Sequence, residues 1–173
     1  KGLAAISTNA RFALDSYRRF IEMYANVVLG LSREPFEHAL SDVKRDLDVR
    51  SDSDVTAEAL EPLIGRFKEI VKRESGSDFP TDVRAQLESA IAAVFESWEN
   101  PRAVRYRRMH DIPGVWGTGV TVQAMVFGNL GDDSGSGVAF TRNPSNGKKS
   151  FYGEFLLNAQ GEDVVAGIRT PRS

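Results

Sequence analysis

The spacing of apolar residues changes at Asp111-Ile-Pro-Gly114, and this change constrains the fold more than any other feature of the chain. Before it, apolar residues recur every three or four positions, as in helices that bury one face. After it, apolar runs of strand length alternate with loops rich in Gly, Ser, Asp and Asn. The pattern predicts an α+β protein, with a helical subdomain over residues 1–110 and a mainly antiparallel sheet over residues 111–173.

The helical half divides into segments at its Gly and Pro residues. The first helix, over about residues 9–29, places Phe20, Ile21 and Tyr24 on one face, and Gly30 suits the left-handed position after its end. Further helices are predicted from the Ser32-Arg-Glu-Pro35 start signal to about Asp48, and over about residues 56–73, 81–98 and 102–109. The helix at 81–98 has an apolar stripe of Val83, Leu87, Ile91, Val94, Phe95 and Trp98.

Strands are predicted only after residue 111. Residues 118–127 alternate, with Val120, Val122, Ala124 and Val126 on one side. Further strands are predicted at 137–141, 150–157 and 164–168, and the turn Asn143-Pro-Ser-Asn-Gly147 would join the first two of these as a hairpin. We expect more sequence to be needed to complete this sheet.

Composition excludes several classes of site. The chain has no cysteine, so disulfides and thiolate chemistry are excluded, and only His38 and His110 could act as imidazole ligands or bases. A net charge of -2 gives no reason to expect nucleic acid or an anionic membrane as partner. No run approaches the roughly 18 apolar residues of a membrane span. Without a signal-peptide pattern, the cytoplasm is the expected compartment.

The two ends of the chain suggest a piece of something longer. The chain begins with Lys1 rather than Met, and it stops at Thr170-Pro-Arg-Ser173 without completing a helix or strand. We therefore expect a fragment of a longer protein.

The loop Gly131-Asp-Asp-Ser-Gly-Ser-Gly137 is the first candidate site. Its backbone N–H groups could approach phosphate oxygens, and the hydroxyls of Ser134 and Ser136 would add donors. It is not a Walker A motif, because no Gly-Lys-Ser/Thr follows. The same residue types also favour an ordinary hairpin turn, so both interpretations stay open.

Carboxylates form the second candidate. Glu162 and Asp163 precede the apolar run that starts at Val164, where they could hold Mg²⁺ or a ribose hydroxyl, and Glu154 is a similar candidate one strand earlier. This places the pair at the start of a predicted strand, where paired acids are more often solvated or capping.

Arg102, Arg105, Arg107 and Arg108 form a basic cluster around Tyr106. Nucleic-acid binding is one interpretation. The acidic balance of the whole chain favours a solvated face or an interdomain contact instead. For His38 and His110 we expect structural or exposed roles.

Several long sequence segments of this chain resemble segments of the pyruvate, phosphate dikinase family. They run in the family's order from about Asn9 to Pro171. They are Asp15-Ser-Tyr-Arg-Arg-Phe-Ile-Glu-Met-Tyr24, Ser97-Trp-Glu-Asn-Pro-Arg-Ala103, Tyr106-Arg-Arg-Met109, Val122-Gln-Ala-Met-Val-Phe-Gly-Asn129, Gly137-Val-Ala-Phe-Thr-Arg-Asn-Pro144, Tyr152-Gly-Glu-Phe155 and Asn158-Ala-Gln-Gly-Glu-Asp-Val-Val-Ala-Gly167.

The resemblance implies part of an N-terminal, ATP-grasp-like nucleotide-binding domain. In that family the domain cleaves ATP with Mg²⁺ and passes a phosphoryl group to a histidine on a swivelling domain. A barrel domain then transfers it between pyruvate and phosphoenolpyruvate. The partners would thus be ATP and two domains of the same parent chain, with no nucleic acid or membrane, and the parent would be a homo-oligomer.

The resemblance also implies roles for individual residues. Gln123, Met125 and Val126 match the strand that lines the adenine pocket. Ser136 and Gly137 match the loop that covers the phosphates, and Glu162 matches a residue beside the ribose and metal. A separate hypothesis, which rests on the polar character and expected surface positions of Arg102 and Glu154, is that these two residues face the swivelling domain.

Other parts of the family's machinery would lie outside this sequence. The phosphate-binding lysine and an arginine would precede Lys1, and the metal-binding acidic strand would follow Ser173. Neither His38 nor His110 lies in the phosphohistidine motif. We therefore expect that this chain alone does not turn over and binds ATP weakly at best.

Three alternatives remain beside the dikinase interpretation. The first is a phosphoenolpyruvate synthase-like phosphotransferase of the same superfamily. The second is a non-catalytic adaptor module on the same scaffold. A nucleic-acid module comes last, because only the basic cluster suggests it.

Overall fold

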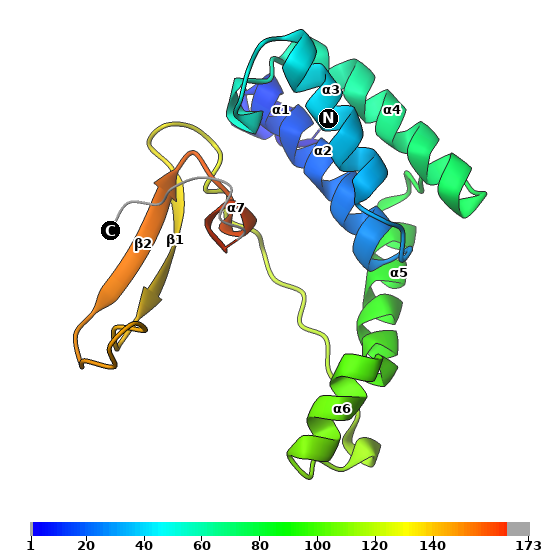
Figure 1. Ribbon diagram of the computed structural model, residues 1–173. Helices are drawn as coiled ribbons and strands as arrows, with labels where there is room; N and C mark the ends of the chain where they lie inside the picture. The colour runs from blue at the N-terminus through cyan, green and yellow to red at the C-terminus, as the bar shows by residue number, and fades with distance from the viewer. Residues whose placement is uncertain (1, 166–173) are drawn as a thin grey trace. The chain divides into compact units, whose positions relative to one another are not determined.

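The computed structural model describes residues 2–165, as helices followed by one β-hairpin and a short final helix (Figure 1). The α-helices are α1 (Gly2–Ser7), α2 (Ala10–Val27), α3 (Glu34–Asp46), α4 (Ala57–Ser75), α5 (Val83–Glu96), α6 (Pro101–Met109) and α7 (Gly161–Val165). The 3₁₀ turns are η1 (Asp52–Asp54), η2 (Ser97–Glu99) and η3 (Gly114–Trp116), and the strands are β1 (Gly135–Phe140) and β2 (Tyr152–Leu157). The α+β class expected from the sequence is confirmed.

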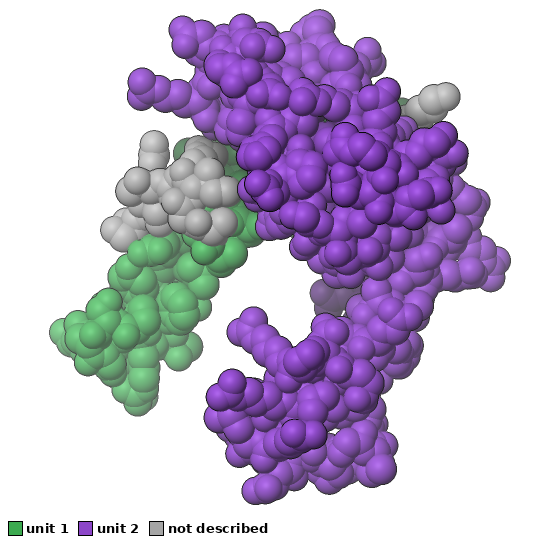
Figure 2. Space-filling view, turned by 45° about the vertical axis from the view of Figure 1, so that its right-hand side comes forward, with its two compact units in different colours: residues 1–14, 124–173 green, residues 15–123 purple. Residues whose placement is uncertain are grey.

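The chain forms two compact units, coloured separately in Figure 2. One unit consists of residues 15–123, and we call it the helical unit. The other consists of residues 1–14 and 124–173, and we call it the hairpin unit. The domain boundary expected near residue 110 stays a prediction.

The predicted helices are present because local signals define their ends. Thr56 and Asp82 cap α4 and α5, since their side-chain oxygens accept hydrogen bonds from the backbone N–H groups of Ala59 and Ala85. Gly76 ends α4 in the left-handed conformation, at φ 75°. The short helix α1 lies in a stretch for which no helix was predicted.

Helices α2, α3 and α4 enclose the core of the helical unit. The rings of Phe36 and Phe67 meet edge to face, with centroids 5.1 Å apart, and both side chains are fully buried. Phe79, which follows α4, packs against Tyr24 of α2 with a centroid distance of 5.4 Å. The apolar stripes predicted for α3 and α4 therefore form a real core.

An ion cluster is also buried in this unit. The guanidinium of Arg18, which is 2% exposed, lies 2.8 Å from Asp15 Oδ1, 3.4 Å from Glu22 Oε2 and 3.5 Å from Asp52 Oδ2. Arg33 and Lys44 add bonds of 3.1 Å to Glu22 and 2.9 Å to Asp52. The apolar face predicted for α2 does not by itself predict this cluster of buried charges.

The apolar stripe of α5 does not pack as the sequence suggests. Helix α5 forms as predicted, but none of its residues is buried among the residues described, and Val83 and Phe95 are 77% and 51% exposed. Within the helical unit, α5 leads away from the layer formed by α2, α3 and α4 (Figure 1). The stripe consequently has no facing helix there.

The hairpin unit contains the single sheet of residues 2–165, in which β1 and β2 pair antiparallel. Gly135 lies opposite Leu157, and Phe140 lies opposite Tyr152. The turn predicted at Asn143–Gly147 closes the hairpin, since Gly147 N donates to Asn143 O at 2.9 Å. These two strands confirm the predictions at 137–141 and 150–157.

Two predicted strands are wrong. Residues 118–127 are irregular, because alternation favours a half-buried strand only when a neighbouring strand supplies the ladder, and the described residues supply none there. Val164 and Val165 lie in α7 rather than in a strand. Residues 166–168 of that predicted strand lie outside the described residues.

A salt bridge between α3 and α4 gives a test by titration. Hydrogen bonds from Arg66 and Arg45 hold the pKa of Asp42 below its ordinary value of 3.8. The stability that this carboxylate contributes is therefore present above pH 3.8 and is lost as the pH falls through the lowered pKa. Substituting Arg66→Gln is expected to raise the pKa of Asp42 in an NMR titration. Arg84→Gln, which removes a partner of Glu88, should leave it unchanged.

Candidate functional site

The candidate site lies at the end of the hairpin where β1 begins and β2 ends. The irregular segment 128–134 leads into β1 there, and residues 158–160 connect β2 to α7. Helix α7 lies beside this end of the hairpin (Figure 1). Within the hairpin unit, this arrangement places Ser136, Gly137 and Glu162 on neighbouring elements.

The glycine-rich loop is shorter than the sequence suggests. Gly135, Ser136 and Gly137 belong to β1, so only residues 131–134 form the loop. The physical reason is the pairing of this end of β1 with β2, in which Ser136 lies opposite Leu156 and Gly137 lies opposite Phe155. Because successive strand residues point to opposite faces, Ser136 and Gly137 present different sides of the hairpin.

Gly137 and Gly128 lie where a side chain has no room. A Cβ on Gly137 would lie 2.8 Å from Glu154 O and 3.0 Å from Phe155 Cβ. A Cβ on Gly128 would lie 2.4 Å from Ala159 O and 2.6 Å from Gly135 O. These glycines therefore allow close backbone packing at the base of the hairpin.

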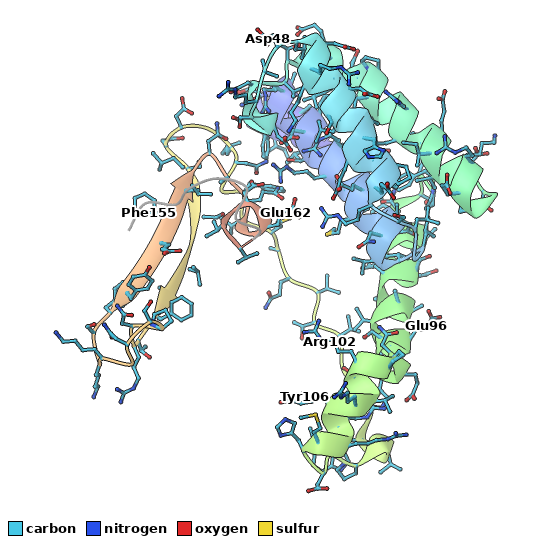
Figure 3. The ribbon with its side chains drawn as sticks, in the orientation of Figure 1. Asp48, Glu96, Arg102, Tyr106, Phe155 and Glu162 are labelled. Carbon is cyan, nitrogen blue, oxygen red and sulfur yellow. The ribbon has the colours of Figure 1, made fainter. Side chains whose placement is uncertain are left out.

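Glu162 and Asp163 lie in the first turn of α7, not at the start of a strand. Asp163 is 7% exposed and accepts a hydrogen bond of 2.8 Å from Gln160 N, which is one half of a capping box. The helix forms because this cap holds its first turn and because Val164 packs with Leu156 and Ala159. Asp163 thus has a structural role, while Glu162 is exposed (Figure 3).

Glu154 and Tyr152 lie on one face of β2. The Tyr152 hydroxyl donates to Glu154 Oε1, and this hydrogen bond raises the pKa of Tyr152 above its ordinary value of 10.0. Val138 lies opposite Glu154 on the same face. The carboxylate is therefore held in place on the hairpin by a neighbouring phenol.

The three residues expected to line an adenine pocket lie in the irregular segment before the hairpin. Gln123, Met125 and Val126 are all exposed, with Met125 at 62% and Val126 at 92%. Met125 and Val126 fall in the hairpin unit, and Gln123 is the last residue of the helical unit. The described residues thus place no apolar cover over these side chains.

The basic cluster on α6 separates into two kinds of residue. Arg107 is 8% exposed, lies 4.0 Å over the Trp98 ring and donates to Trp98 O, so it is structural. Arg102, Arg105 and Arg108 are exposed. Figure 3 shows Arg102 and Tyr106 on α6. The centroids of the Tyr106 and His110 rings lie 4.3 Å apart, with the ring planes tilted by 39°.

Two features bear on metals and membranes. Among residues 2–165, no group of three or more His, Asp or Glu side chains is arranged to hold a metal ion. No helix in the described part of the chain is both long enough and apolar enough to cross a membrane.

Sequence patterns did not indicate the residues that join the two segments of the candidate site. Gln160 Nε2 donates to Asn129 Oδ1 at 3.2 Å, and Ala159 N donates to Gly128 O at 2.9 Å. These pairs lie about thirty positions apart, so no local periodicity could link them. The one indication in the sequence was that these residues lie in or beside the segments that resemble the pyruvate, phosphate dikinase family.

Comparison with known families gives a match over most of the chain. The sequence model of the family described as "Pyruvate phosphate dikinase, AMP/ATP-binding domain" matches residues 36–173. This range includes all of the candidate site residues named above.

Individual relatives match nearly the whole chain. Pyruvate, phosphate dikinase from Clostridium symbiosum is 55% identical over 99% of this chain and 20% of its own length. That of Rhizobium meliloti (strain 1021) is 58% identical over 95% of this chain and 18% of its own length. The chloroplastic pyruvate, phosphate dikinase 1 of Zea mays is 55% identical over 98% of this chain and 18% of its own length. The chain spans about a fifth of the length of these relatives.

Proposed function

The chain belongs to the family of pyruvate phosphate dikinase AMP/ATP-binding domains, and from this membership we propose that it forms part of the ATP site of a longer pyruvate, phosphate dikinase. The observation that carries the proposal is the identity of 55–58% to proteins of that name over nearly the whole chain. The parent protein would use ATP and phosphate to convert pyruvate to phosphoenolpyruvate through a phosphohistidine.

Residues in the hairpin unit and just before it would contact the nucleotide. We assign the adenine to Gln123, Met125 and Val126, whose exposed side chains are available to a flat apolar ligand. The phosphates would lie at the start of β1, which holds Ser136 and Gly137. The hydroxyl of Ser136 and the backbone of Gly137, which carries no side chain, suit an approach by phosphate oxygens.

Glu162 would lie beside the ribose and the metal. Its carboxylate could accept from a ribose hydroxyl or contribute one oxygen to Mg²⁺, with the phosphates supplying others. When bound, the ion would neutralise charge on the phosphates. Glu162 is an exposed residue of α7, which suits either role.

Other domains of the parent chain would supply the remaining chemistry. Arg102 and Glu154 would face the swivelling phosphohistidine domain, and Tyr152 would hold Glu154 in position for that contact. The barrel that binds pyruvate would also lie elsewhere in the parent, which we expect to be a homo-oligomer in the cytoplasm. The isolated chain is expected to be inactive, because transfer depends on positioned cations that other parts of the nucleotide-binding domain would supply.

Alanine substitution of Glu162 tests this proposal. In the full-length dikinase, Glu162→Ala should raise the Kd for MgATP about tenfold, because one charged contact to the nucleotide is lost. The control is Glu96→Ala, which removes an exposed carboxylate from α5 (Figure 3). Calorimetric titration of both variants gives the comparison. Equal affinity of the Glu162 variant and the unsubstituted protein would refute the assignment.

A further inference from the structure

Hydrogen bonds join two segments of the hairpin unit, residues 128–134 and 158–160, next to the proposed site. Ala159 N donates to Gly128 O at 2.9 Å, and Asn158 N donates to Ser134 O at 2.8 Å. Two side-chain pairs join the same segments. Gln160 Nε2 donates to Asn129 Oδ1 at 3.2 Å, and the exposed Asn158 Nδ2 donates to Asp132 Oδ1 at 3.3 Å. We call the Asn129–Gln160 pair the amide latch.

The amide latch is partly shielded from water. Asn129 is 5% exposed, and Gln160 is partly buried. A hydrogen bond in such surroundings is stronger than one in water, and breaking it leaves a buried polar group unpaired. The Nδ2 atom of Asn129 already has no hydrogen-bond partner among the described residues, so Asn129 depends on Gln160 for its side-chain bond.

The position of the latch links it to both halves of the proposed site. The segment that holds Asn129 continues through the glycine loop into Ser136 and Gly137 of β1. Gln160 immediately precedes α7, and Glu162 lies two residues further on. The latch thus constrains the position of the proposed phosphate contacts relative to Glu162.

We propose that Asn129 and Gln160 are positioning residues that hold the start of β1, with Ser136 and Gly137, in place for the polyphosphate of a nucleoside triphosphate. The proposal rests on the proposed function, because it needs Ser136 and Gly137 to contact phosphates. The two amides act through this start of β1 and not by direct contact with the nucleotide. The benefit therefore grows with the number of phosphates that Ser136 and Gly137 contact.

The effect of a substitution on the Kd should therefore depend on the number of phosphates in the ligand. This dependence distinguishes a positioning role of the pair from a role in stability alone. Gln160→Met in the full-length dikinase keeps the length and apolar volume of the side chain but loses the donor. It is expected to raise the Kd for ATP about three- to tenfold and that for AMP less than about twofold. Gln160→Ala, which leaves a space as well, should show the same order of effects.

Titration calorimetry with ATP and with AMP is the measurement, and melting temperatures are recorded for each variant. The matched control is Gln86→Met, which removes a side-chain donor bonded to Pro80 O in the helical unit and should change neither Kd. Asn129→Ala combined with Gln160→Met should weaken ATP binding no more than either substitution alone, since both remove one bond.

Two results would overturn the proposal. One is an unchanged Kd for ATP in both Gln160 variants, and the other is an equal loss for ATP and AMP, which is the mark of a purely structural pair. If the unsubstituted protein binds neither nucleotide, the proposed function itself fails and this inference fails with it. Normal binding by the unsubstituted protein therefore distinguishes the two failures.

Discussion

Substituting Arg18→Met is expected to destabilise the helical unit by about 3–5 kcal/mol, the usual cost of removing one partner from a buried ion pair. Asp15 is 3% exposed and Glu22 is 9% exposed, so neither carboxylate can recover its hydration without unfolding around it. The bonds from Arg19 to Asp15 and from Arg33 to Glu22 remain, at 3.2 Å and 3.1 Å. They place the expected loss toward the lower end of that range.

Hydrogen exchange in the full-length protein measures this loss locally. Amides of α2 should exchange at least about a hundredfold faster in the Arg18 variant, provided that they exchange through opening of this unit. Arg84→Met is the control, because the Arg84–Glu88 pair is exposed on α5 and such pairs contribute at most about 1 kcal/mol. Equal exchange of α2 in the two variants would show that the cluster is not important for stability.

Gly128→Ala is expected to cost about 3 kcal/mol, the upper part of the range for overpacking. The added Cβ would lie 2.2 Å from Ser136 Oγ, 2.4 Å from Ala159 O and 2.6 Å from Gly135 O. The serine hydroxyl can rotate away, but the two carbonyl oxygens belong to the backbone. The segment must therefore move away from β1 and from the turn before α7.

The matched control is Gly65→Ala on α4, where a Cβ would meet nothing within 4 Å. Replacing a helical glycine by alanine in open space should stabilise the protein by about 0.5–1 kcal/mol. Exchange of the β1 and β2 amides should be faster in the Gly128 variant and unchanged in the Gly65 variant. A Gly128 variant with normal exchange would contradict the close packing described at this position.

The sequence predicted the helices well because each carries its own evidence. Periodic apolar residues and capping side chains lie within one segment, so Thr56, Asp82 and Gly76 mark helix ends without reference to the rest of the chain. The packing of the helices could not be predicted in this way. The stripe on α5 predicts a helix correctly, yet it cannot say which surface covers that helix.

Strands were harder to predict because they need a partner. The hairpin was found since its turn at Asn143–Gly147 joins two adjacent segments. Residues 118–127 have an equally good alternation but no paired strand among the described residues. At α7, the cap formed by Asp163 outweighed the β-propensity of Val164 and Val165.

Much less of the candidate site could be predicted from residue types. The glycine loop and Glu162 stood out by composition, and family resemblance gave them expected roles. The amide latch and the tight packing at Gly128 depend on contacts between residues 128–136 and 158–160. Such contacts exist only after the hairpin has formed, so they required the structure.

The most direct test of the central claim is a calorimetric titration of the full-length dikinase with MgATP, beside the same titration of this 173-residue chain. We expect saturable binding by the full-length protein, weaker binding after Glu162→Ala, and weak or no binding by the chain alone. Absence of binding by the full-length protein would contradict the claim that this chain forms part of an ATP site.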